Sequence, residues 1–264
     1  MIISWSKGPA DQNMPEQILT QTLESVRRHP WWHARAKLAM AVLRQHGLAP
    51  PAVVLDVGCG WGVNLDALES AGYTATGLDI SRQILERIDH PGRHLIEADL
   101  NQPLPAQGQG AEAALVLDVI EHVDDDTAFL RCCAQLLRPG GLALVSVPAR
   151  PDLFSEFDSV QGHRRRYLPD RLKLAFVGTG LDVQKLLWWG EWMVPLLNRR
   201  RKTNRQNGAD PAKTYADYLR LPPWPAPCLM KLIYAWEQPR ALKGKLHTGT
   251  SLFAVAVRQR PEPN

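Results

Sequence analysis

The sequence predicts an α/β fold, a doubly wound sheet of largely parallel strands. Between residues 50 and 148, apolar runs of strand length alternate with stretches of helical periodicity, which is the pattern that right-handed crossover connections produce. An acidic residue directly follows four successive apolar runs, and the first run ends in a cluster of glycines. With 264 residues, 45% of them hydrophobic, the chain is apolar and long enough for one domain, which we expect to span 1–264.

Five strands are expected in the first part of the chain. The first, over 52–55, is a continuous apolar run rich in β-branched side chains, as expected for a strand buried on both faces. The others are expected over 73–78, 94–98, 113–117 and 142–147. Two helices over 15–46 precede these strands, and further helices are expected over 62–71, after Ser81 and over 125–137.

The part after Pro148 continues the fold with a different order of elements. A helix is expected over 169–178, a strand over 181–188, a helix over 227–241 and a last strand over 251–257. If the two late strands pair as an antiparallel hairpin, a long insertion over 189–249 separates them. Because no Gly/Ser-rich linker marks a second domain, we interpret 149–264 as an elaboration of the same fold.

Composition excludes several classes of protein. The net charge is +4, which is too small to indicate a nucleic-acid partner, but residues 151–264 carry 19 basic and 10 acidic side chains against 12 and 17 in residues 1–150. The second part is therefore expected to face any anionic partner. No signal peptide, no apolar run of about 18 residues and no paired cysteine motif are present, so we expect a cytoplasmic protein with reduced thiols.

The strand ends carry the residues that indicate ligand binding. In a doubly wound sheet the ligand lies at the carboxyl ends of the strands, where Asp56, Asp79, Asp99 and Asp118 are expected. The glycines over 58–62 allow close approach of the backbone to a ligand. Asp79 follows Gly58 by 21 residues and is placed to accept hydrogen bonds from a ribose diol.

A dinucleotide site and an S-adenosylmethionine site both fit these features at first. The dinucleotide fingerprint needs a third glycine where this sequence has Val63. The motifs VVLDVGCGWG, GLDIS, EADL, LVLDVIEHVDD and LRPGGLALVSVP occur in that order, and together they resemble the class I S-adenosylmethionine-dependent methyltransferases. The resemblance covers 50–148 closely and implies S-adenosyl-L-methionine as cofactor. It also implies a Rossmann-like seven-stranded sheet of order 3-2-1-4-5-7-6 with strand 7 antiparallel.

The resemblance also implies a role for each motif. The first acid and the glycine loop would hold the methionine part of the cofactor, the second acid the ribose and the third the adenine amino group. The residues assigned to the cofactor in this way are Asp56, Gly58, Cys59, Gly60, Gly62, Asp79, Ile80, Asp99, Leu100, Asp118 and Val119.

The loop after the fifth strand is expected to meet the methyl acceptor. Its sequence FSEFDSVQGHRRRY combines His163 and Tyr167, our candidates for catalysis, with Asp158 and three arginines. A neutral histidine can take a proton from a hydroxyl group, and arginines bind carboxylate or phosphate; a solvated basic loop is the alternative. The residues assigned to the acceptor are Glu121, His122, Asp158, Arg164, Arg165 and Arg166.

A metal site is an alternative use of part of this region. The D-x-x-E-H pattern of Asp118, Glu121 and His122 is similar to the E-x-x-E-H metal site of some methyltransferases, including ubiquinone-pathway O-methyltransferases. Carboxylates with imidazole suit a divalent ion. The first ligand of the pattern is Asp118 here, whose side chain is shorter than the glutamate of the metal-binding pattern. The sequence offers no further ligand except His163, so it predicts neither the presence nor the absence of a metal.

The function that these patterns predict is transfer of a methyl group, most readily to oxygen, on a small or lipid-linked acceptor of anionic character.

Tryptophans at 188, 189, 192, 224 and 236 near the basic run 199–202 suggest peripheral contact with the inner face of a membrane; aromatic packing within a lid is the alternative. RNA contact by 199–205 is less favoured, because no aromatic residue interrupts that run. A cofactor-binding protein without transfer activity also fits the motifs.

Overall fold

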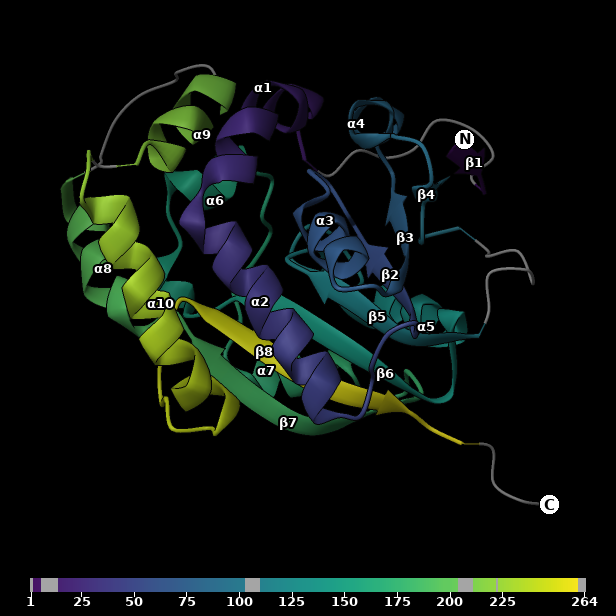
Figure 1. Ribbon diagram of the computed structural model, residues 1–264. Coiled ribbons are helices and arrows are strands. Elements are labelled where there is room, and N and C mark those ends of the chain that lie inside the picture. Colours follow the sequence, from purple (N-terminus) through teal and green to yellow (C-terminus); the bar gives the residue numbers. More distant parts are fainter. Residues whose placement is uncertain (1, 6–13, 103–109, 204–210, 222, 261–264) are drawn as a thin grey trace.

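The computed structural model describes residues 2–5, 14–102, 110–203, 211–221 and 223–260. Eight strands form one sheet in the order β1-β4-β3-β2-β5-β6-β8-β7 (Figure 1). The strands are β1 (Ile2–Ser4), β2 (Val53–Val57), β3 (Thr74–Asp79), β4 (His94–Glu97), β5 (Ala111–Leu117), β6 (Leu137–Pro148), β7 (Leu181–Trp189) and β8 (Ser251–Arg258). Strand β8 is antiparallel to both of its neighbours, and every other pair is parallel.

The predicted fold class and strand order are confirmed. Strands β4-β3-β2-β5-β6-β8-β7 correspond to the expected order 3-2-1-4-5-7-6, and β7 and β8 form the antiparallel hairpin around a long insertion. The sheet has eight strands instead of the expected seven, because β1 adds to the outer edge of β4. A strand of three residues is too short for a periodicity to reveal it.

Helices cover both faces of the sheet. They are α1 (Glu16–Arg28), α2 (Pro30–Gln45), α3 (Val63–Ser70), α4 (Arg82–Ile88), α5 (Asp126–Leu136), α6 (Glu156–Val160), α7 (Pro169–Ala175), α8 (Val194–Thr203), α9 (Pro211–Leu219) and α10 (Ala226–Leu242), with short 3-10 turns at Pro151–Leu153 and Glu191–Met193. Helices α2, α3, α4 and α10 pack on one face and α5 and α7 on the other (Figure 1).

The residues of the central strands explain this arrangement. In β2, the side chain of Val54 lies in one core and that of Leu55 in the other, so a parallel strand covered on both sides needs an unbroken apolar run. The helices start where the sequence offers a cap: Ser81 Oγ accepts a hydrogen bond from the Ile84 amide at 3.2 Å, and Asp125 Oδ1 accepts one from the Ala128 amide at 2.8 Å.

The insertion between β7 and β8 is more helical than expected. Helix α10 confirms the predicted helix over 227–241, whereas α8 and α9 were not predicted. The basic run 199–202, whose composition predicts a solvated loop, lies within α8, and residues 204 and 205 lie outside the described residues. The segment 101–110, whose sequence NQPLPAQGQG predicts a loop, is likewise described only at its ends. Among the helices of the described segments, none is long and apolar enough to cross a bilayer.

Candidate active site

A large cavity of about 850 Å³ opens at the carboxyl ends of β2, β3, β4 and β5. Its other walls come from α1, α2, the segment 153–166 and helices α8 to α10. This is the edge of a doubly wound sheet where ligands bind. The acids and glycines at the strand ends therefore line one side of the cavity. Side chains from the N-terminal helices and from the part of the chain after β6 line the other side.

The glycine loop forms the part of the cavity next to β2 and β3. Gly58 has a φ of 71°, and a Cβ added there would lie 2.5 Å from Val119 Cγ2, so only glycine fits. Asp79 organises the same loop because its Oδ2 accepts a hydrogen bond from the Gly60 amide at 2.8 Å and its Oδ1 one from the Ser81 amide at 2.9 Å. Burial raises the pKa of Asp79, and these amide donors counteract that rise.

Most residues assigned to the cofactor line this cavity. Besides Gly58 and Asp79, the lining includes Cys59, Gly60, Ile80, Asp99, Leu100, Asp118 and Val119. Asp99 lies at the end of the β4 segment and accepts a hydrogen bond from the Asn101 amide at 2.9 Å. Three of the four acids at the strand ends thus line one space.

Two residues assigned to the cofactor lie behind the lining. Gly62, with a φ of 74°, starts α3 and does not line the cavity. Asp56 is fully buried; its Oδ1 accepts a hydrogen bond from Asn64 Nδ2 at 3.2 Å, and its Oδ2 has no hydrogen-bond partner among the described residues. Burial raises the pKa of this carboxyl to about 7. Asp56 therefore acts on a bound ligand indirectly, through Asn64, which lines the cavity.

Arg35 of α2 is a site residue that could not be recognised in the sequence. It lines the cavity, forms an ion pair with Asp118, and its guanidinium carbon lies 4.9 Å from the centre of the Trp31 ring. Asp118 has a φ of 59°, and its other oxygen accepts a hydrogen bond from Ser146 Oγ at 3.0 Å. An arginine 83 residues away from its partner leaves no local signal in the sequence.

His163 is held by a buried charge network. Its Nδ1 lies 3.0 Å from Asp158 Oδ1, and Arg166 donates to both oxygens of Asp158 at 2.7 and 3.1 Å. Burial alone would raise the pKa of Asp158, but the bonds from His163 and Arg166 hold it below its usual value. An ionised Asp158 accepts a hydrogen bond from Nδ1–H of His163, which leaves Nε2 as the ring nitrogen with the free lone pair.

The other residues of the basic segment point away from the cavity. Arg164 pairs with Asp124, and Arg165 contacts Asp126 at 3.4 Å; neither lines the cavity. The hydroxyl of Tyr167 donates a hydrogen bond to Asp126 Oδ2 at 3.0 Å from a fully buried position, also outside the lining. Burial raises the pKa of Tyr167 far above its usual value. Arg164 and Arg165, which we expected to bind the acceptor, are therefore paired with acids of the protein itself.

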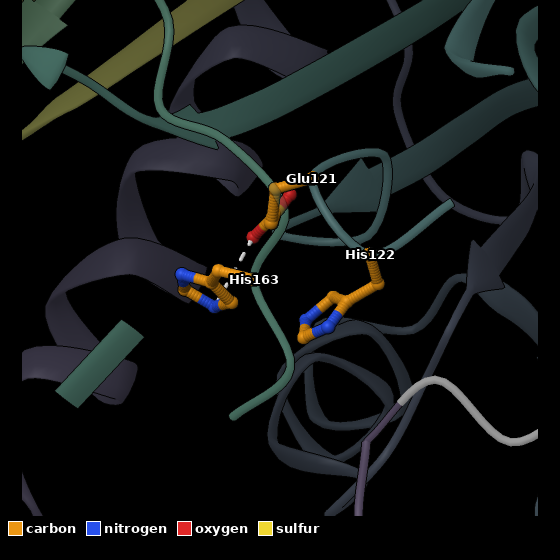
Figure 2. Close-up of side chains that lie close together, drawn as sticks. All are labelled: Glu121, His122 and His163. Carbon is orange, nitrogen blue, oxygen red and sulfur yellow. Dashed lines mark ion pairs between the residues drawn. The ribbon is translucent and has the colours of Figure 1, made fainter. Parts of the chain in front are cut away.

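Figure 2 shows Glu121, His122 and His163 side by side, with the Glu121 carboxylate turned toward His163. Glu121 Oε1 lies 3.8 Å from His163 Nε2, and the ligand atoms of the three residues lie within 4.8 Å of one another. Both Glu121 oxygens and His122 Nδ1 are buried and have no hydrogen-bond partner among the described residues. This donor set fits a divalent ion. Asp118, the first residue of the predicted pattern, is not part of this cluster and pairs with Arg35 instead.

Without an ion, these buried groups are held in their neutral forms. Burial and the nearby Asp118 raise the pKa of Glu121 well above its usual value, and burial and His163 lower the pKa of His122 to about 3. A neutral carboxyl group and a neutral imidazole in the cavity wall are partners for a hydroxyl group of a bound ligand.

The part of the cavity away from the sheet is largely apolar. Helices α8 and α10 contribute Leu196, Leu197, Leu229, Met230 and Ile233. Helix α9 contributes Tyr215, whose ring stacks between Trp61 of the glycine loop, at 6.1 Å, and Phe157 of α6, at 5.2 Å. This apolar wall was not predicted, because its residues come from helices whose side-chain directions depend on their packing.

Comparison with known proteins identifies the fold family. The methyltransferase domain family matches residues 31–215, which is more than half of the chain. The chain belongs to this family. The predicted membership of the S-adenosylmethionine-dependent methyltransferases is therefore confirmed, and S-adenosylmethionine is the cofactor of the family.

Curated relatives and solved structures are similar to this chain in sequence and in fold, respectively. The ubiquinone biosynthesis O-methyltransferase of Caulobacter sp. (strain K31) is 30% identical over 54% of this chain and 64% of the relative. The [4+2]-cyclase SpnF has a similar fold, with a TM-score of 0.59 and 18% identity over 93% of this chain and 94% of its own. Phosphoethanolamine N-methyltransferase 2 of Haemonchus contortus, solved with S-adenosyl-L-methionine, has a TM-score of 0.51 and 15% sequence identity. That match covers 85% of this chain and 52% of the Haemonchus chain.

These likenesses have a limited reach. The chain spans less than two thirds of the length of the curated relatives it matches. The solved structures are under 25% identical and show the fold alone. The reaction and the acceptor of this protein therefore have to be inferred from its own residues.

Proposed function

We propose that this protein transfers a methyl group from S-adenosylmethionine to a hydroxyl oxygen of a largely apolar acceptor, either small or lipid-linked. The observation that carries the proposal is that His163, oriented by the buried Asp158, lines the same cavity as the glycine loop and Asp79. A basic nitrogen and a cofactor site that share one apolar cavity are the parts that O-methylation needs.

The chain's own residues account for each requirement of the reaction. S-adenosylmethionine supplies an electrophilic methyl group on its sulfonium. His163 Nε2 takes the hydroxyl proton while the acceptor oxygen forms the new C–O bond and the C–S bond breaks, and S-adenosylhomocysteine leaves. Asp158 keeps the proton on Nδ1 and stabilises the imidazolium that forms. The stacked rings of Trp61, Tyr215 and Phe157 exclude water from the reacting atoms.

The acceptor that we propose is apolar around its reactive hydroxyl. Arg164 and Arg165 lie outside the cavity, and Arg166 is paired with Asp158, so the three arginines expected to bind an anion are not free to do so. For an anionic group on the acceptor, we propose Arg220 instead, because it is exposed and lines the cavity. Charge reversal at Arg165 should accordingly lower stability and leave acceptor binding unchanged.

The test is transfer of labelled methyl groups from S-adenosylmethionine to phenolic and other hydroxylated acceptors of graded chain length, and to a source-cell extract separated into organic, aqueous, protein and RNA fractions. Enzyme-dependent label in organic-soluble material, lost in the His163→Gln variant, is the expected result. Label in RNA would overturn the proposal. Binding of S-adenosylhomocysteine without transfer to any fraction would favour a cofactor-binding protein without methyltransferase activity.

Metal-assisted O-methylation is a second candidate, favoured by the unpartnered atoms of Glu121 and His122. Glu121, His122 and His163 would hold a divalent ion, which would supply Lewis-acid activation of the acceptor hydroxyl. Titration of the purified protein with Zn²⁺ or Mn²⁺ by calorimetry, for the wild type and Glu121→Gln, tests this assignment without an activity assay. Stoichiometric binding that Glu121→Gln abolishes supports the metal. Absence of binding, with activity that EDTA does not change, leaves His163 as the base.

A further inference from the structure

Helix α10 presents an apolar stripe away from the protein. The side chains at 228, 229, 232, 235, 236 and 239 are exposed, and their spacing of three and four residues places them along one side of the helix. Trp236 is 61% exposed and Leu232 is 68% exposed; Trp224, just before the helix, is 82% exposed. Exposed tryptophan and leucine side chains on one face mark an interaction surface.

The opposite side of α10 holds the helix firmly in the fold. Tyr234 stacks on Trp189 at 5.3 Å, and the Glu237 carboxylate accepts hydrogen bonds from the amides of Gly190 at 3.1 Å and Glu191 at 2.7 Å. Lys185 Nζ donates to the Leu242 carbonyl at 2.6 Å. Packing of α10 against the sheet thus uses one face of the helix and leaves the apolar stripe outside.

The exposed and partly exposed charges of the segment that carries the stripe are all positive. Between residues 220 and 245 the only acid is Glu237, which is buried, whereas the basic residues at the surface or partly exposed are Arg220, Lys231, Arg240, Lys243 and Lys245. The Arg240 guanidinium lies 4.6 Å from the centre of the Trp236 ring. An apolar stripe with tryptophans and flanking cations is complementary to a bilayer with anionic headgroups.

The stripe also adjoins the cavity. Leu229 of α10 and Leu196 of α8 are each 56% exposed, and both line the cavity. The apolar surface is therefore continuous with the apolar wall of the site. By contrast, Trp188 and Trp192 are only partly exposed and Trp189 is buried, so these three predicted lipid contacts belong to internal packing.

From these observations we propose that Trp224 and the outer face of α10 dock the protein on an anionic bilayer, with the mouth of the cavity at the membrane surface. A lipid-linked acceptor then reaches the cavity along Leu229 and Leu196 without crossing water. This step rests on the proposed function, whereas the docking itself does not require an acceptor or cofactor.

Flotation with vesicles of phosphatidylcholine, alone or mixed with phosphatidylglycerol, tests the docking on the full chain. We expect flotation with the mixed vesicles and an at least about tenfold weaker partition for the double variant Leu232→Glu and Trp236→Glu, because charged side chains oppose insertion at the interface. Leu174→Glu, which changes a leucine of α7 that is 63% exposed and outside the cavity lining, is the matched control and should float like the wild type.

Other outcomes overturn the docking proposal. Absence of flotation, or equal flotation of the double variant, rules it out. A dimer in sedimentation that the double variant dissociates, without vesicle binding, assigns the stripe to a second copy of the chain. All variants should retain S-adenosylhomocysteine binding. If vesicles bind but no acceptor is methylated, the docking stands and the proposed reaction fails; if a detergent-dispersed acceptor is methylated without vesicle binding, the reaction stands and the docking fails.

Discussion

Asp158 Oδ1 binds two partners at once, Nδ1 of the His163 imidazole at 3.0 Å and Nε of the Arg166 guanidinium at 2.7 Å. The arginine keeps the carboxylate ionised, and the carboxylate fixes the tautomer of the histidine. A segment that looked like a basic anion-binding loop therefore holds the imidazole of His163 in a fixed orientation in the cavity wall.

His163→Gln should lower kcat by about 10²- to 10⁴-fold, the usual contribution of a general base. The affinity for S-adenosylhomocysteine should stay within about twofold, because the glycine loop and Asp79 lie on other strand ends. Steady-state kinetics and calorimetry measure the two effects. His94→Gln, a change at an exposed histidine of β4, serves as the control. An unchanged kcat in the His163 variant would remove His163 as the base.

Gly58→Ala should abolish cofactor binding and lower the free energy of unfolding by about 1–3 kcal/mol, since it adds strain to a positive φ and a contact with Val119. Gly92→Ala is a matched control: its φ is 88°, but nothing lies within 4 Å of the added Cβ. Denaturant unfolding should therefore show a smaller loss for Gly92→Ala. Adding Val119→Ala to Gly58→Ala should recover part of the stability, and failure to do so would show that the contact is unimportant.

Asp56→Asn should change how stability depends on pH in the cofactor-free protein. The folded carboxyl has a pKa of about 7 against an ordinary value of 3.8, because of burial. The folded state therefore holds a proton that the unfolded state has lost, so the contribution of this carboxyl to the free energy of unfolding falls as pH rises from about 4 to about 7 and is level above that.

The Asp56→Asn variant lacks this fall, and its advantage over the wild type should grow to at most about 4 kcal/mol by pH 7. Urea unfolding at a series of pH values measures it, with the exposed Asp217→Asn as control. Parallel curves for the wild type and the Asp56 variant would contradict the protonated carboxyl.

Arg35→Met should destabilise the protein by about 3–5 kcal/mol, because it leaves Asp118 partly buried without its cation. Arg28→Met removes a pair with Glu24 whose side chains are 81% and 74% exposed, and should cost less than about 0.5 kcal/mol. The double variant Arg35→Met and Asp118→Asn should recover part of the loss. If it is no more stable than Arg35→Met, the packing of Arg35 on Trp31 matters more than its charge.

Much of the fold could be predicted from the sequence because its signals are local. The unbroken apolar run around Val54 requires a strand covered on both faces, and a chain of such strands and helices permits few topologies. The edge strand β1 and helices α8 and α9 were missed, since three residues show no periodicity and a basic helix resembles a loop in composition.

The sequence by itself determined the fold class, the order of the strands, the glycine loop and the acids at the strand ends, because these follow from patterns within short segments and from the geometry of parallel sheets. Only the tertiary structure decided which charges neutralise one another. Arg35 meets Asp118 across 83 residues, Arg166 turns to Asp158, and the outer face of α10 is left uncovered. Such pairings depend on how distant elements pack, and burial strengthens them. Arg166, which the sequence analysis assigned to the acceptor, is therefore bound to another residue of the protein.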